Sequence, residues 1–217
     1  RMRNRAEAAL RQADDPKKQK EALAAIIDES DDLIAVFNAL LMIARAESGE
    51  ARDHMTEFDA AEIAQDVSEL YEPLAEDKGL TLRVETHPAP VKANRELVSQ
   101  ALANLADNAI QYAASESGDT NGKHPEIVLT ADTKDIRIQL SVGDGGPGIP
   151  EADRGRVIER FVRLEHSRSK PGSGLGLSLA SAVARLHGGE LKLEDNAPGL
   201  KAIIELPRAA VAEAVRI

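Results

Sequence analysis

Apolar residues three and four positions apart dominate the first 47 residues of the chain. Two helices are predicted there, over 1–13 and 17–47, with Pro16 where the second one begins. The second helix carries an almost continuous heptad seam of Leu23, Ile26, Ser30, Leu33, Phe37, Leu40 and Ala44. Such a helix is ~45 Å long, and the short first helix cannot cover its apolar stripe. The pattern favours an antiparallel hairpin that is half of a dimeric four-helix bundle; packing onto the rest of the chain is the alternative.

The pattern changes after residue 47. Residues 48–58 are polar and include Gly49, so they are expected to form a hinge. Helical spacing returns in residues 59–78, where the apolar positions are Ala61, Ile63, Ala64, Val67, Leu70 and Leu74. A further helix is predicted at 95–113, with an apolar stripe of Leu102, Leu105, Ala106, Ala109 and Ile110, and another at 175–187. Strands are predicted at 80–85, 126–132, 135–144, 189–195 and 200–207, and residues 87–93 are expected to form a turn that runs into a short strand. Residues 59–208 are therefore expected to form a two-layer α/β sandwich with a tail at 209–217, which makes the fold class α+β.

Composition and charge narrow the range of functions. The chain has 217 residues and a net charge of −10, whereas a nucleic-acid partner requires a basic surface, so no nucleic acid is expected. It has no cysteine, which excludes disulfides, thiolate metal sites and a cysteine nucleophile and suits a reducing compartment. No apolar run approaches the ~18 residues of a membrane span. We therefore expect a cytoplasmic location and no membrane contact by these residues.

Two polar clusters stand out against apolar surroundings. Asn104 and Asn108 lie one turn apart on the predicted helix 95–113, where their amide oxygens could bind Mg²⁺ beside phosphate and water. Capping or cross-linking a neighbouring element is the alternative for these amides. Asp144 follows a predicted strand and precedes a run of glycines, so it could accept a hydrogen bond from an exocyclic amine such as that of adenine. A hairpin turn with an Asx motif is the alternative for Asp144.

A glycine-rich stretch precedes the last predicted helix. Glycines at every second position from Gly172 to Gly176 lead into residues 175–187, and the unpaired N–H groups of a helix N-terminus attract phosphate. The stretch is neither a P-loop nor a dinucleotide-binding fingerprint, because the residues that complete those motifs are absent. The preceding segment has three cations, either as a lid over phosphates or as a solvated charge run: Arg163, Arg168 and Lys170. Together, the metal amides, the amine acceptor and the glycines indicate an adenine nucleotide with Mg²⁺.

In this order, the stretches resemble the sequence boxes of the sensor histidine kinases of two-component signalling. The segments "NLADNAIQYA" (104–113), "DGGPGIP" (144–150), "RVIERFVRLE" (156–165) and "GSGLGLSLA" (172–180) resemble the N, G1, F and G2 boxes. Residues 1–47 resemble the dimerisation and phosphotransfer domain, and about 57–208 the catalytic ATP-binding domain. The resemblance implies a Bergerat-type ATPase fold with ATP and Mg²⁺ as cofactors.

The resemblance also implies roles for individual residues. Asn108 is the implied Mg²⁺ ligand with Asn104 close by, and Asp144 is the implied partner of the adenine amine. Phe161 is implied to anchor the lid, and Arg163 to reach phosphate. The remaining implied nucleotide contacts are Tyr112, Gly146, Gly148, Ile149, Lys170, Gly172, Ser173, Gly174, Leu175 and Gly176.

In function, the resemblance implies the cytoplasmic core of a homodimeric kinase that transfers the γ-phosphoryl group of ATP to a His and then to an Asp of a response regulator protein. The parent could be an inner-membrane sensor. The family's phosphoacceptor His box is absent from the first helix, and the chain begins within a helical pattern, so we expect a fragment that binds Mg-ATP without phosphorylating itself. Gln111 stands where many relatives carry Lys, which bears on one phosphate contact. The alternatives are an ATP-binding regulatory scaffold and another Bergerat-type ATPase, such as an anti-sigma serine kinase.

Overall fold

The computed structural model describes residues 54–113, 125–164 and 174–209, together with parts of a helix between residues 20 and 44. The order of elements after that helix is β1 (Thr56–Asp59), α3 (Ala60–Asp77), β2 (Thr81–Thr86), β3 (Pro90–Ala93), α4 (Arg95–Ala113), β4 (Glu126–Lys134), β5 (Arg137–Gly143), α5 (Glu151–Arg154), α6 (Gly176–Leu186), β6 (Glu190–Asp195) and β7 (Leu200–Pro207). None of the helices in this described part is long and apolar enough to cross a bilayer.

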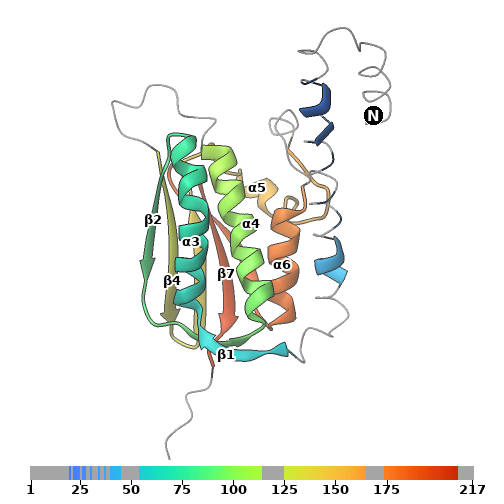
Figure 1. Ribbon diagram of the computed structural model, residues 1–217. Coiled ribbons are helices and arrows are strands. Elements are labelled where there is room, and N and C mark those ends of the chain that lie inside the picture. The colour runs from blue at the N-terminus through green and yellow to red at the C-terminus, as the bar shows by residue number, and fades with distance from the viewer. Residues whose placement is uncertain are drawn as a thin grey trace, which may run out of the picture.

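One mixed sheet forms the base of the fold. Its five strands have the order β2-β4-β5-β7-β6, and only the pairing of β2 with β4 is parallel. The three long helices α3, α4 and α6 cover one face of this sheet (Figure 1). A sheet with one face covered by helices is a two-layer sandwich, so the predicted α+β fold class is confirmed.

The core lies between the sheet and the three helices. Alternate residues of β4 and β5 are fully buried toward the helices: Ile127, Leu129 and Ala131 in β4, and Ile138 and Leu140 in β5. Each buried Leu or Ile side chain contributes roughly 1.5–3 kcal/mol through the hydrophobic effect. The predicted apolar stripe of α4 completes this core, and its members are Leu102, Leu105, Ala106, Ala109 and Ile110.

The buried face of α3 differs from the predicted one. Leu70 is 71% exposed and Leu74 is also exposed, although both belong to the apolar spacing in the sequence. Three of the predicted positions, Ile63, Ala64 and Val67, are buried as expected, and the other buried residues are small: Ala60, Ser68 and Ala75. Small side chains let α3 lie close to the sheet, and they carry a weaker hydropathy signal than the two leucines.

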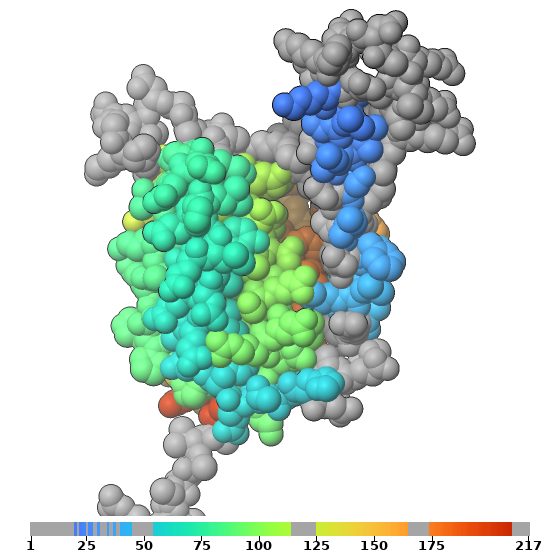
Figure 2. All heavy atoms as spheres, in the orientation of Figure 1, coloured from blue at the N-terminus to red at the C-terminus, as the bar shows by residue number. Residues whose placement is uncertain are grey.

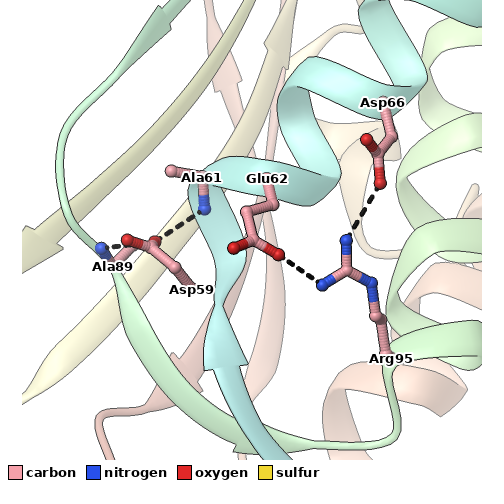
Figure 3. Close-up of polar contacts among 6 residues, drawn as sticks. All are labelled: Asp59, Ala61, Glu62, Asp66, Ala89 and Arg95. Carbon is pink, nitrogen blue, oxygen red and sulfur yellow. Dashed lines mark hydrogen bonds and ion pairs between the residues drawn. The ribbon is translucent and has the colours of Figure 1, made fainter.

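A small second sheet fastens the start of α3. β1 pairs with β3 in antiparallel register, so the predicted hinge 48–58 ends in a strand from Thr56 onward rather than in a loop. Asp59 caps α3, since its Oδ1 accepts hydrogen bonds of 2.9 Å from the N–H groups of Ala61 and Ala89. Arg95 at the start of α4 pairs with Glu62 and Asp66 of α3, which joins the two helices (Figure 3).

The N-terminal helix divides into two parts by burial. At its end, Met42 and Ile43 are buried in the same hydrophobic core as the sandwich, and Figure 2 shows this end lying against the body of the molecule. Further back, the large apolar side chains are exposed: Leu23, Ile27, Ile34, Phe37 and Leu41. The end of this helix therefore packs on the rest of its own chain, as the alternative prediction had it. For the remainder of the helix, the dimeric bundle stays a prediction. The predicted first helix, 1–13, lies outside the described residues.

Candidate nucleotide-binding site

The predicted site residues come from three places that meet at the C-terminal half of α4. Asn108 lies against the start of α6, because a Cβ atom added to Gly176 would lie 2.7 Å from Asn108 Nδ2. The loop after β5 reaches the end of the same helix, since a Cβ atom on Gly146 would lie 3.3 Å from the carbonyl oxygen of Tyr112. The structure thus brings the N-box, G1-box and G2-box segments together around one helix.

Asp144 is a buried carboxylate with backbone partners. It follows the last residue of β5 and is 6% exposed. Its Oδ1 accepts hydrogen bonds from the N–H groups of Gly146, at 2.8 Å, and Leu200, at 3.3 Å. Burial raises the pKa of Asp144, and the two backbone donors act against this by favouring the charged form. Within the part of the chain that the structure describes, both bonds end on Oδ1, which leaves Oδ2 as an acceptor for a ligand.

The first turn of α6 has no side-chain cap among the residues that the structure describes. Leu175 occupies the N-cap position, where its apolar side chain cannot cap the helix, and it is fully buried. Its carbonyl oxygen accepts hydrogen bonds from the Leu179 N–H and the Ser178 hydroxyl, which fixes the first turn. The first N–H groups of a helix have no partner inside the helix and carry its positive dipole end. Since a Cβ atom on Gly176 would lie 2.7 Å from Asn108 Nδ2, the start of α6 and the Asn108 amide are neighbours.

The two predicted amides of α4 differ in their partners. Asn104 Nδ2 donates to the carbonyl oxygen of Gln100 at 2.8 Å, one turn earlier, so its Oδ1 is the atom left for a ligand. Asn108 is half-buried and lies beside the α6 start. The charge of the acidic neighbour Asp107 acts on the α3 side of the helix: burial and this charge raise the pKa of Tyr71 of α3, and Lys78 at the C-cap of α3 acts to lower the pKa of Asp107, which burial raises. Asp107 therefore faces the α3 side of the helix.

The segment predicted as a lid is described at both of its ends. The Phe161 N–H donates to the carbonyl oxygen of Gly174 at 3.2 Å, and a Cβ atom on Gly174 would lie 3.0 Å from Arg163 Cγ. The ends of the segment therefore meet in front of α6. The Phe161 side chain is 59% exposed and its φ is 63°, so the contact made here is through its backbone, and anchoring by its ring stays a prediction. Lys170, Gly172 and Ser173 lie outside the described residues.

The rest of the G1 loop is held by neighbouring backbone. Gly148 has a φ of 68°, and a Cβ atom there would lie 2.7 Å from the carbonyl oxygen of Gly199. The carbonyl oxygen of Ile149 accepts a 3.0 Å hydrogen bond from Arg154 Nε. This loop therefore packs against the turn between β6 and β7, and no local pattern in the sequence predicts this contact.

Comparisons with known proteins agree on the class of this fold. Residues 93–210 match the family described as Histidine kinase-, DNA gyrase B-, and HSP90-like ATPase. The adaptive-response sensory kinase SasA of Crocosphaera subtropica is 33% identical over 194 residues, 86% of this chain and 48% of SasA. The catalytic domain of histidine kinase ThkA aligns at 28% identity with a TM-score of 0.60, over 71% of this chain and 97% of that domain. Full-length ShkA in complex with AMPPNP has the same fold at 24% identity and a TM-score of 0.70, over 91% of this chain and 40% of ShkA.

The chain belongs to the family of histidine kinase-, DNA gyrase B- and HSP90-like ATPases. Within it, the sensor kinase relatives identify the sandwich as a catalytic ATP-binding domain of the histidine kinase type, which confirms the resemblance seen in the sequence. The chain spans about half of the length of SasA.

Proposed function

We propose that this chain is the kinase core of a two-component sensor histidine kinase and that it binds ATP together with Mg²⁺. The observation that carries the proposal is the buried Asp144 carboxylate, which keeps one oxygen for a ligand. It lies at the end of α4, the same helix that places Asn108 against the start of α6. An amine acceptor and an anion-binding helix end, both next to α4, suit the two ends of ATP. The family match and the sensor kinase relatives support this proposal over the regulatory scaffold.

Different residues bind the adenine base and the phosphates. Asp144 Oδ2 accepts the hydrogen bond of the adenine exocyclic amine, and its burial excludes water that would compete for it. The first N–H groups of α6 receive the phosphates. The Asn108 amide oxygen is a hard ligand that suits Mg²⁺, whose other ligands are phosphate oxygens and water. The metal, when bound, neutralises phosphate charge, and catalysis is mostly positioning and charge stabilisation.

In the whole protein, the γ-phosphoryl group passes to a His nitrogen and then to an Asp of a response regulator. The helix between residues 20 and 44 forms the dimer through its exposed apolar side chains, and the core is cytoplasmic. None of the five His residues of this chain lies within residues 1–47, where the resemblance expects the phosphoacceptor. This chain is therefore expected to bind Mg-ATP without labelling itself.

Calorimetric titration of ATP tests the nucleotide site directly. We expect the unaltered chain to bind ATP, and binding to weaken at least about tenfold when Mg²⁺ is removed or when Asn108 is changed to Ala. Gln65→Ala is the matched control, because it removes an exposed amide of α3 that lies away from α6. Absence of ATP binding to the unaltered chain would contradict the proposal.

Phosphate transfer is tested with γ-labelled ATP. The chain alone should acquire no label, whereas a chain extended upstream to include its phosphoacceptor helix should acquire an acid-labile label. An acid-stable label on Ser of a partner protein would instead indicate the serine kinase alternative.

A further inference from the structure

The carbonyl oxygen of Asp144 is released from the sheet by an exchange of hydrogen bonds. Asp144 lies opposite Leu200 at the end of the β5–β7 ladder, and its N–H donates to the Leu200 carbonyl oxygen at 2.9 Å. In a regular antiparallel ladder, such a pair would also form the return bond from the Leu200 N–H to the Asp144 carbonyl oxygen. Here the Leu200 N–H donates to the Asp144 carboxylate instead. The side chain has therefore taken the place of its own carbonyl group.

Asn196 supplies the donor that the released carbonyl group needs. Its Nδ2 donates to the Asp144 carbonyl oxygen at 2.8 Å, across Gly143, where a Cβ atom would lie 3.3 Å from the same Nδ2. The turn itself is closed by a 3.1 Å hydrogen bond from the Asn196 N–H to the Gly199 carbonyl oxygen. A buried carbonyl group without a donor is costly, so the Asn196 amide makes the exchange of bonds favourable.

We propose that Asn196 is a positioning residue for the base end of the site: by holding the Asp144 carbonyl oxygen, it keeps the Leu200 N–H on the carboxylate and so orients Oδ2 toward the adenine amine. This inference rests on the proposed function. Without the Asn196 donor, the Leu200 N–H returns to the carbonyl oxygen and the carboxylate loses one of its two backbone donors. The carboxylate is then less well oriented, and its charged form is less well stabilised.

A comparison of two nucleotides separates positioning from general stability. Inosine triphosphate carries a carbonyl oxygen where adenosine triphosphate carries the exocyclic amine, so it cannot donate a hydrogen bond to Asp144 from that position. The affinities of the unaltered chain, Asn196→Ala and Asn196→Asp for both nucleotides are measured by calorimetry with Mg²⁺ present. Asn196→Asp has the same shape without the donor, and its added charge acts equally on both triphosphates. Asp195→Asn is the matched control in the same turn, where its side chain keeps an oxygen for the Ala197 N–H.

The expected result is a fall in the ratio of ATP to inosine triphosphate affinity. The ratio should fall about threefold to tenfold in Asn196→Ala and further in Asn196→Asp, with the inosine triphosphate affinity of Asn196→Ala unchanged within about twofold. The control should keep the ratio of the unaltered chain. Equal losses for both nucleotides, or an unchanged ratio in folded variants, would overturn the role of Asn196. If the unaltered chain binds neither nucleotide, the proposed function itself fails.

A double substitution tests whether Asn196 acts through Asp144. In an Asp144→Asn background there is no carboxylate left to orient, so adding Asn196→Ala should cause no further loss of ATP affinity. An additive loss in the double variant would show that Asn196 acts independently of Asp144 and would overturn the inference.

Discussion

The two ends of the proposed nucleotide site are built in different ways. At the base end, Asp144 is buried, and backbone or amide groups from the G1 loop and the β6–β7 turn hold both its carboxylate and its main chain. At the phosphate end, the proposed ligands are a helix N-terminus and the half-buried amide of Asn108, which packs on Gly176. In the proposed site, the base end is thus fixed without a nucleotide, whereas the phosphate end presents groups that a nucleotide and a metal ion would complete.

This difference suits the two tasks. An acceptor that is already oriented binds a base more tightly, because no entropy is lost in ordering its side chain when the base binds. Phosphoryl transfer requires charge stabilisation that follows a moving group, and lid segments commonly supply part of it. Substitutions should therefore affect the base end through the rigid backbone, and the phosphate end through individual side chains.

Gly199→Ala should have the largest effect, because it changes the rigid base end of the proposed site. A Cβ atom there would lie 1.8 Å from the Asp144 carbonyl oxygen, and the φ of 113° is strained for alanine. We expect the free energy of unfolding to fall by about 3 kcal/mol or more and ATP binding to be lost. Denaturant unfolding measures the first effect and calorimetry the second. Gly155→Ala is the control, because Gly155 has a φ of −66° and open space around it. Similar stability of the two variants would refute a rigid base end.

Asp144→Asn should weaken ATP binding without unfolding the chain. The asparagine Oδ1 can still accept from the Gly146 N–H, but its Nδ2 cannot accept from the adenine amine. Loss of a hydrogen bond to a charged group costs about 1.5–3 kcal/mol, which corresponds to roughly a tenfold to hundredfold loss of affinity. Calorimetry with ATP and inosine triphosphate measures this: the ATP affinity should fall, whereas the inosine triphosphate affinity should not, because the asparagine Nδ2 can donate to the inosine carbonyl oxygen. A matching loss for inosine triphosphate would mean that Asp144 does not read the amine.

The sequence predicted those parts of the molecule that depend on local pattern. The apolar stripe of α4 and the glycines before α6 were found because helical spacing and turn residues are local signals. β1 was missed because four residues, of which only Phe58 is a large apolar residue, do not make a readable alternation. Asn196 was missed because its partner Asp144 lies 52 residues away, and such contacts depend on how strands pair. The missed features of the site thus belong to the base end, where long-range backbone contacts decide the geometry.

Gly176→Ala should have a moderate effect confined to the phosphate end. The new Cβ atom would lie 2.7 Å from Asn108 Nδ2, so this side chain must move, while alanine favours the helix. We expect about a tenfold loss of Mg-ATP affinity with little change in unfolding temperature. In an Asn108→Ala background the same substitution should be neutral, because the displaced amide is gone. A tenfold loss that persists in that background would show that Gly176 acts without Asn108.

The smallest effect concerns the opposite ends of α4 and α6, which are joined by a buried imidazole. His187 Nδ1 lies 2.7 Å from the carbonyl oxygen of Val183, which can only accept, so Nδ1 carries the proton. Its Nε2 accepts a 2.9 Å hydrogen bond from the Asn94 N–H, next to the start of α4. Protonation of Nε2 would break this bond, and burial lowers the pKa of His187 from 6.5. The packing of α4 on α6, and with it the contact of Asn108 with Gly176, is thus expected to depend on a neutral His187.

The pH dependence of stability tests this. Because the unfolded chain binds the proton more readily than the folded one, the contribution of His187 is complete above about pH 6.5 and falls as the pH drops toward the folded pKa. The raised pKa of buried Asp144 has the opposite sign, since the folded chain then binds the proton more readily. The difference between the unaltered chain and His187→Gln removes the Asp144 contribution. We expect this difference in unfolding free energy to shrink between about pH 7.5 and about pH 5.5. A constant difference for His187→Gln would mean that the neutral imidazole does not hold the two helices together.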